Sequence, residues 1–160
     1  MKSIILTFLI CLTSLLFSQR NEMRKNTVSI DIDKMTEKKT KQINLPTSSL
    51  KTMSESSIGL TLKDSTYSLY SYVYKSGWIF VESLLVKLDG KLFEFKSQNN
   101  IRIVEPQAYV SERNWYTPTK EFIEAFKNAK EISYRITGKD SFMDFDIKEK
   151  KLSIIPEFFK

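Results

Sequence analysis

The chain has 160 residues, a formal net charge of +6, no histidine and one cysteine. This length suits one domain of ordinary size. Without histidine, the protein lacks the commonest general base at neutral pH and the commonest metal ligand, so enzymes and zinc sites that depend on that side chain are excluded.

The positive charge is unevenly distributed. Residues 19–57 contain 8 basic and 5 acidic residues, whereas residues 58–160 contain 16 basic and 14 acidic ones. A nucleic-acid-binding domain needs a concentrated basic surface, and the second part of the chain is nearly neutral. The sequence therefore argues against a nucleic-acid partner.

The first 18 residues have the pattern of a secretory signal peptide. Lys2 precedes an apolar run over residues 4–16, and Ser18 places a small residue directly before Gln19. The alternative is a membrane anchor, but the apolar run is shorter than the roughly 20 residues that span a bilayer. Cys11 follows large apolar residues, unlike a lipid-attachment cysteine. We therefore expect an exported protein, periplasmic or secreted, whose mature chain has no membrane span, no cysteine and no thiol chemistry.

Residues 19–57 form a polar leader in which only residues 27–33 alternate between apolar and polar side chains. This alternation favours a possible edge strand. Residues 34–57 combine charge, serine and threonine with few large apolar groups, so we expect them to be partly disordered. The folded domain is predicted to occupy residues 58–160.

The central stretch, residues 67–95, predicts three strands joined by two tight turns, after a short strand over residues 58–62. The stronger turn is Asp89-Gly90, because a type I′ hairpin needs positive φ at both central residues. The weaker turn spans residues 75–77, with glycine in the left-handed position. The Asp-Gly turn fixes a register that pairs Leu88 with Lys91, Val86 with Phe93 and Leu84 with Phe95, all on one apolar face.

Beyond the central stretch, residues 101–104 and 108–115 are expected to be strands. Thr117 is the predicted N-cap of the main helix, with proline at the first helical position. The helical spacing of its apolar residues predicts one buried stripe, formed by Phe122, Ile123, Phe126 and Ala129.

Residues 132–136 and 142–147 predict a second hairpin. The tail, residues 148–160, has apolar residues at helical spacing and favours a short C-terminal helix, although Pro156 would kink it and a strand over residues 152–155 is the alternative.

Recognisable catalytic motifs are absent from the sequence. There is no Walker loop, no G-x-G-x-x-G fingerprint and no G-x-S-x-G elbow, so nucleotide binding and serine catalysis of those kinds are not predicted. Glu105 and Glu112 could form a carboxylate pair like those of glycosidases, but any chain with this many acids offers such pairs. We predict no cofactor and favour a protein that is not an enzyme.

Three acidic residues near the second hairpin, Asp140, Asp144 and Asp146, are weak metal candidates. Carboxylates are suitable ligands for Ca²⁺, yet their spacing matches no calcium loop. Asp31 and Asp33 repeat the same geometry on the possible edge strand. Solvated carboxylates on an exposed strand face are the simpler interpretation, so no metal site is predicted.

The aromatic residues are the most informative candidates. Tyr70, Tyr72 and Tyr74 share one face of a predicted strand, and Trp115 lies just before the helix. If exposed, such a face could stack against sugars, peptides or bases. The alternative is that the tyrosines are there as good strand formers whose hydroxyls reach water. We name these four residues as candidate ligand-binding residues.

Together the patterns predict an α+β domain, with an antiparallel sheet covered by one main helix. The favoured function is a non-catalytic binding, accessory or structural protein of the periplasm or cell exterior. Its partner would be a protein, a small molecule or a glycan. A hydrolase that uses only carboxylates, and a secreted toxin or inhibitor of a partner protein, are the alternatives.

Overall fold

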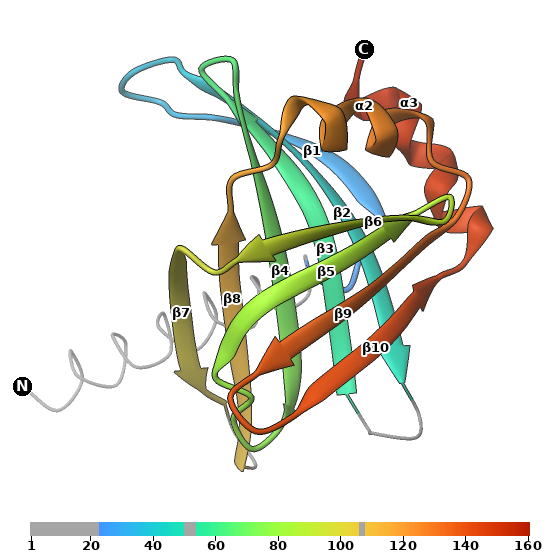
Figure 1. Cartoon of the computed structure of the whole chain (residues 1–160). Coiled ribbons are helices and arrows are strands. Elements are labelled where there is room, and N and C mark those ends of the chain that lie inside the picture. The colour runs from blue at the N-terminus through green and yellow to red at the C-terminus, as the bar shows by residue number, and fades with distance from the viewer. Residues whose placement is uncertain (1–22, 50–53, 106–107) are drawn as a thin grey trace, which may run out of the picture.

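The computed structural model describes residues 23–49, 54–105 and 108–160. The predicted signal peptide, with Cys11, lies outside the described residues. The regular structure is mostly antiparallel strand, in two sheets that pack against each other (Figure 1). In the described ranges no helix has the length and apolar character that crossing a membrane would require.

The larger sheet has six strands in the order β1-β2-β3-β4-β8-β7. Their bounds are β1 Thr27–Ile32, β2 Lys39–Ser49, β3 Ser54–Lys63, β4 Thr66–Ser76, β8 Tyr109–Tyr116 and β7 Asn99–Val104. β1 to β4 form a meander, and β8 then pairs with β4.

The smaller sheet has four strands in the order β10-β9-β5-β6. These are β10 Phe142–Ile147, β9 Ile132–Gly138, β5 Val81–Leu88 and β6 Lys91–Lys96. The helices are α2 Lys120–Asn128, the 3₁₀ helix η2 Glu149–Ile154 and α3 Ile155–Phe158. α2 and α3 lie at one end of the two sheets, near the C-terminus (Figure 1).

One apolar core fills the space between the sheets, because each strand turns alternate side chains inward. The larger sheet contributes Ile43, Leu45, Ile58, Leu60, Leu69 and Val73, and the smaller sheet contributes Leu84, Val86, Phe93, Phe95, Ile136 and Phe145. Phe122 of α2 closes the end of this core. Its ring meets Phe93 and Phe95 edge-on, at centroid distances of 5.2 and 4.9 Å.

The Asp89-Gly90 hairpin is confirmed. Both residues have positive φ, 47° and 88°, and the predicted pairs between β5 and β6 are the observed ones. The second hairpin is also confirmed, since β9 and β10 pair antiparallel with Met143, Phe145 and Ile147 buried. The tail forms η2 and the short α3, as its helical spacing predicted, and not the alternative strand.

The prediction of a hairpin at residues 75–77 is wrong. Gly77 does have positive φ, 76°, but β4 pairs with β3 and β8, while β5 pairs with β6 and β9. Residues 77–80 carry the chain from one sheet to the other and are called the crossing below. Phe80 has a second positive φ, 55°, which redirects the chain away from a hairpin.

Residues 39–49, expected to lie in the polar leader, form the long strand β2. Ile43 and Leu45 are fully buried there, and the possible edge strand is present as β1. Pro46 is tolerated because the pairing of β1 with β2 ends at Asn44. A chain that began near Ser57 would lack both strands and part of the core.

The expectation of one main helix covering the sheet does not hold. α2 has nine residues and lies at one end of the core, because the four-stranded sheet covers the inner face of the larger one. The helix also begins later than predicted. Thr119, not Thr117, is the N-cap, and its hydroxyl accepts a hydrogen bond from the Phe122 amide at 3.1 Å.

We predict that Phe126→Ala lowers the free energy of unfolding by about 3–5 kcal/mol, because the fully buried ring would leave a cavity. Chemical denaturation measures the change. Glu124→Ala, on the exposed side of the same helix, is the control and is expected to stay within about 0.5 kcal/mol of the unaltered protein. A loss for Phe126→Ala no larger than the control would show that α2 is peripheral to the core.

Candidate functional site

The predicted aromatic residues lie together on the outer face of the six-stranded sheet, away from the core. Tyr70, Tyr72 and Tyr74 project from β4, and Trp115 and Arg113 from the neighbouring β8. The register places Tyr70 opposite Trp115 and Tyr72 opposite Arg113. These five residues, together with Tyr109, are called the aromatic face below.

The three tyrosines are buried, with 2–5% of their surface exposed, while Arg113 and Trp115 are half-buried. Ligand binding at these positions therefore stays a prediction, and the accessible end of the face is the one beside β7. There Asn99 and Ile101 lie opposite Trp115 and Arg113 in the register, and both are exposed.

Tyr70 lies across the sheet rather than standing up from it. Its hydroxyl has one proton to share between the Ile43 carbonyl and the Asn44 side-chain oxygen, at 3.0 and 2.9 Å, and it accepts from Gln42 at 3.1 Å. Gly59 makes this possible, because a Cβ there would lie 2.6 Å from the Tyr70 hydroxyl. Tyr70 of β4 thus reaches over β3 and is held by hydrogen bonds to β2.

A short segment, residues 23–25, crosses the outer face next to the tyrosines. Asn44 donates from its amide to the Met23 and Lys25 carbonyls at 2.9 and 2.7 Å, and Arg24 forms an ion pair with Glu55. Among the described residues, Met23 is the apolar side chain from outside the strands that packs with the three tyrosines. This segment closes the β2–β3 side of the aromatic face and leaves the β7 side accessible.

Arg113 is the charged group of the aromatic face. Its guanidinium lies 5.8 Å from the Trp115 ring centre, and burial lowers its pKa, opposed by Tyr70 and Tyr72. The other three described arginines each pair with a carboxylate, namely Arg24 with Glu55, Arg102 with Glu112 and Arg135 with Asp144. Within the described chain Arg113 has no such partner. Sequence reasoning missed Arg113. The available signal was its position on β8, on the same side of the strand as Tyr109 and Trp115.

The weak metal candidates do not converge. Asp144 is paired with Arg135, at 2.6 Å between Oδ1 and Nε, and this pairing lowers the pKa of Asp144. Asp146 is exposed on the same face, and Asp140 lies in the turn. The described residues include no group of three or more acidic side chains arranged to hold a metal ion.

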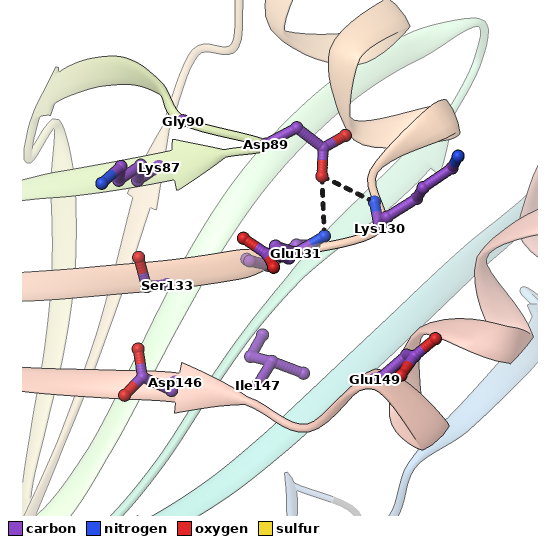
Figure 2. Close-up of a pocket in the computed structure, with 10 residues that line it drawn as sticks. Lys87, Asp89, Gly90, Lys130, Glu131, Ser133, Asp146, Ile147 and Glu149 are labelled. Atoms are coloured by element: carbon purple, nitrogen blue, oxygen red, sulfur yellow. Dashed lines mark hydrogen bonds between the residues drawn. The ribbon is translucent and has the colours of Figure 1, made fainter.

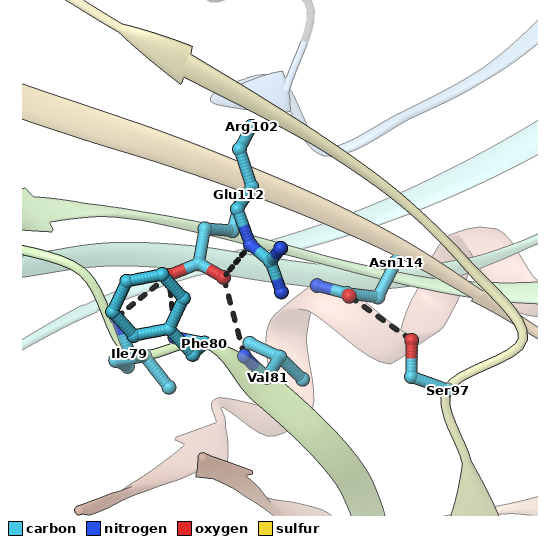
Figure 3. Close-up of polar contacts among 7 residues, drawn as sticks. All are labelled: Ile79, Phe80, Val81, Ser97, Arg102, Glu112 and Asn114. Carbon is cyan, nitrogen blue, oxygen red and sulfur yellow. Dashed lines mark hydrogen bonds and ion pairs between the residues drawn. The ribbon is translucent and has the colours of Figure 1, made fainter. Parts of the chain in front are cut away.

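Glu112 is a buried carboxylate on the opposite, inward face of β8 (Figure 3). It accepts hydrogen bonds from the amides of Ile79, Phe80 and Val81 at 2.6, 3.0 and 3.2 Å, and from Nε of Arg102 at 3.2 Å. Both oxygens are therefore occupied. Glu105, its suggested catalytic partner, accepts from Ser111 at 2.9 Å. Glu112 is placed to hold the crossing between the sheets rather than to transfer a proton to a substrate.

The crossing is held from the other sheet as well. The Ile79 carbonyl accepts from the Lys139 amide at 3.3 Å, and a Cβ on Gly138 would lie 2.0 Å from that carbonyl oxygen. Only glycine permits this approach. Beside Glu112, Asn114 accepts from Ser97 at 3.1 Å, and its buried Nδ2 points toward Arg102 without a partner among the described residues (Figure 3).

A hollow of about 490 Å³ lies at the helix end of the smaller sheet (Figure 2). Its walls carry charges of both signs, among them Lys87, Glu131, Asp146 and Glu149. Asp89 accepts from the Lys130 and Glu131 amides at 2.9 and 2.7 Å, which ties the hairpin to the residues after α2. The mixed charges and open walls provide no convergent set of groups for a reaction.

Comparison of the chain with models of protein families, with curated proteins and with solved structures finds no match.

We predict that Glu112→Gln lowers the free energy of unfolding by about 3 kcal/mol, because an amide cannot accept all four hydrogen bonds and Arg102 loses its partner. Denaturant titration measures the change. Glu94→Gln, an exposed carboxylate on β6, is the matched control. Equal losses for the two variants would contradict the role of Glu112 in holding the crossing.

A second prediction concerns alkaline pH. Burial raises the pKa of Tyr70, Tyr116 and Tyr134 above the ordinary value of about 10. As the pH rises, the unfolded chain loses these protons first, so the stabilisation is complete below about pH 10 and is lost above it. We expect the phenolate absorbance of these three residues to appear only as the strand signal in circular dichroism disappears. Ionisation of all seven tyrosines in a folded protein would contradict this.

Proposed function

We propose that the protein is an exported, non-catalytic binding protein that holds a sugar or another ring-bearing small molecule at the accessible end of the aromatic face. The observation that carries this proposal is the pairing of Arg113 with Trp115. A half-buried arginine costs desolvation energy, and that cost is unusual when no carboxylate offsets it. Groups that are perturbed in this way gather at functional sites.

The neighbours of this pair suit a sugar. Trp115 offers a ring on which a sugar can stack, and Asn99, exposed beside it, offers a carboxamide for hydroxyl groups. Tyr70 is held by hydrogen bonds to β2 and Tyr72 is buried, so this part of the face needs little ordering when a ligand binds.

Binding is favoured over catalysis by the state of three carboxylates that the sequence offered for catalysis or metal binding. Glu112 has both oxygens occupied, Glu105 accepts from Ser111, and Asp144 is paired with Arg135. A glycosidase-like mechanism needs two carboxyl groups that face one substrate. Export rests on the signal-peptide pattern of residues 1–18.

Tryptophan fluorescence and calorimetry with a panel of neutral and acidic monosaccharides and disaccharides test the proposal. We expect at least one saccharide to bind, and Trp115→Ala to weaken its binding by roughly 5- to 150-fold, the range for the loss of one stacking ring. Trp78→Phe, at the crossing between the sheets, is the control for the second tryptophan. Unchanged affinity in Trp115→Ala, or no binding by any saccharide in the panel, would contradict the proposal.

A further inference from the structure

We propose that Arg113 binds the carboxylate of an acidic sugar, so that the ligand is a uronic acid or a saccharide that contains one. This inference rests on the proposed function and adds the charged group that the ligand must carry.

The first support is the pattern of ion pairs among the described arginines. Arg24, Arg102 and Arg135 each contact a carboxylate of this chain, at exposed and part-buried positions. The Arg113 guanidinium lies deeper than those of Arg24 and Arg135, yet it makes no hydrogen bond or ion pair with a described residue. Its contact is with the Trp115 ring. A guanidinium taken this far from water normally has an anion beside it.

The second support is that two acidic groups of the sheet that carries the aromatic face are engaged elsewhere. Glu55, opposite Tyr74 in the register, pairs with Arg24. Glu105 accepts from Ser111, which precedes Arg113 by two positions on β8. Neither carboxylate forms an ion pair with Arg113, so an anionic ligand would meet an unneutralised charge.

The third support is the geometry of the pair. A guanidinium donates two parallel hydrogen bonds to a planar carboxylate, which a lysine ammonium cannot do. The guanidinium carbon of Arg113 lies 5.8 Å from the centre of the Trp115 ring, so the two groups are close enough for one ligand to contact both. One uronic acid could therefore stack on Trp115 and place its carboxylate on Arg113. The exposed side chains of Asn99 and Ile101 border this position from β7.

A carboxylate fits better than a phosphate monoester. Arg113 is a single cation, and the other residues in its register row are the uncharged Ser57, Tyr72 and Ile101. One guanidinium matches one negative charge, whereas a phosphate dianion would need a second cation. Sulfated sugars carry one charge without the planar carboxylate, so they form a separate arm of the test.

The experiment compares three probes by isothermal titration calorimetry: methyl glucuronide, methyl glucoside and glucose 6-sulfate. We expect methyl glucuronide to bind at least about tenfold more tightly than methyl glucoside, in line with one charge-assisted pair. Arg113→Gln should remove this preference, so that methyl glucuronide binds no more tightly than methyl glucoside. Arg113→Lys should keep only part of it, and Arg135→Gln, on the other sheet, should keep all of it.

The outcomes separate this inference from the function on which it rests. Equal binding of methyl glucuronide and methyl glucoside, each sensitive to Trp115→Ala, would overturn the role of Arg113 and leave the sugar-binding proposal intact. Tighter binding of glucose 6-sulfate than of methyl glucuronide would overturn the carboxylate assignment. Failure of all three probes, and of the wider saccharide panel, would overturn the proposed function itself. Circular dichroism of each variant shows that a loss of binding is not a loss of fold.

Discussion

The carboxylate of Glu112 is the group on which the connection of the two sheets depends. The chain passes from β4 to β5 through residues 77–80, where Phe80 takes a positive φ that costs a side-chain-bearing residue about 1–2 kcal/mol. Three consecutive amides, those of residues 79–81, would be left without strand partners at this corner. Glu112 accepts from all three, so one buried side chain offsets both the strain and the lost backbone hydrogen bonds.

Local features of the fold could be predicted from the sequence, whereas the division into two sheets could not. Asp89-Gly90 fixes its hairpin through backbone conformation alone, and the observed register follows. Gly77 also takes the predicted left-handed conformation, but pairing depends on where the chain goes next. The contacts that decide this, from Glu112 and Gly138 to Ile79, join residues more than 30 positions apart along the chain. Alternation of apolar residues shows that a strand has a buried face without showing which sheet it joins.

The polar leader shows a second limit of composition. Lysine, serine and threonine in residues 39–49 suggested a segment that could not bury enough surface. In β2 these residues lie on both sides of a central stretch, 42–46, in which Ile43 and Leu45 are fully buried. The candidate site was also only partly predictable from the sequence. The strand period groups Tyr70, Tyr72, Tyr74 and Trp115 on one face. It does not show how deeply the tyrosines are buried or that Arg113 lacks an ion pair among the described residues, because these properties depend on residues 23–25, Asn44 and the register of β4 with β8.

β8 connects the stability of the fold with the proposed site. Its inward residue Glu112 holds the corner at residues 77–80, and the inward Asn114 accepts from Ser97 in the connection between β6 and β7. Its outward residues, Arg113 and Trp115, form the accessible end of the aromatic face. Neighbouring residues of a strand point to opposite faces but share one backbone, so the side chains on one face cannot shift without those on the other. The hydrogen bonds of Glu112 therefore also fix the position of Arg113, one residue away on the opposite face. A site on such a strand is pre-organised by the same contacts that hold the two sheets together, which is the property expected of a rigid binding surface.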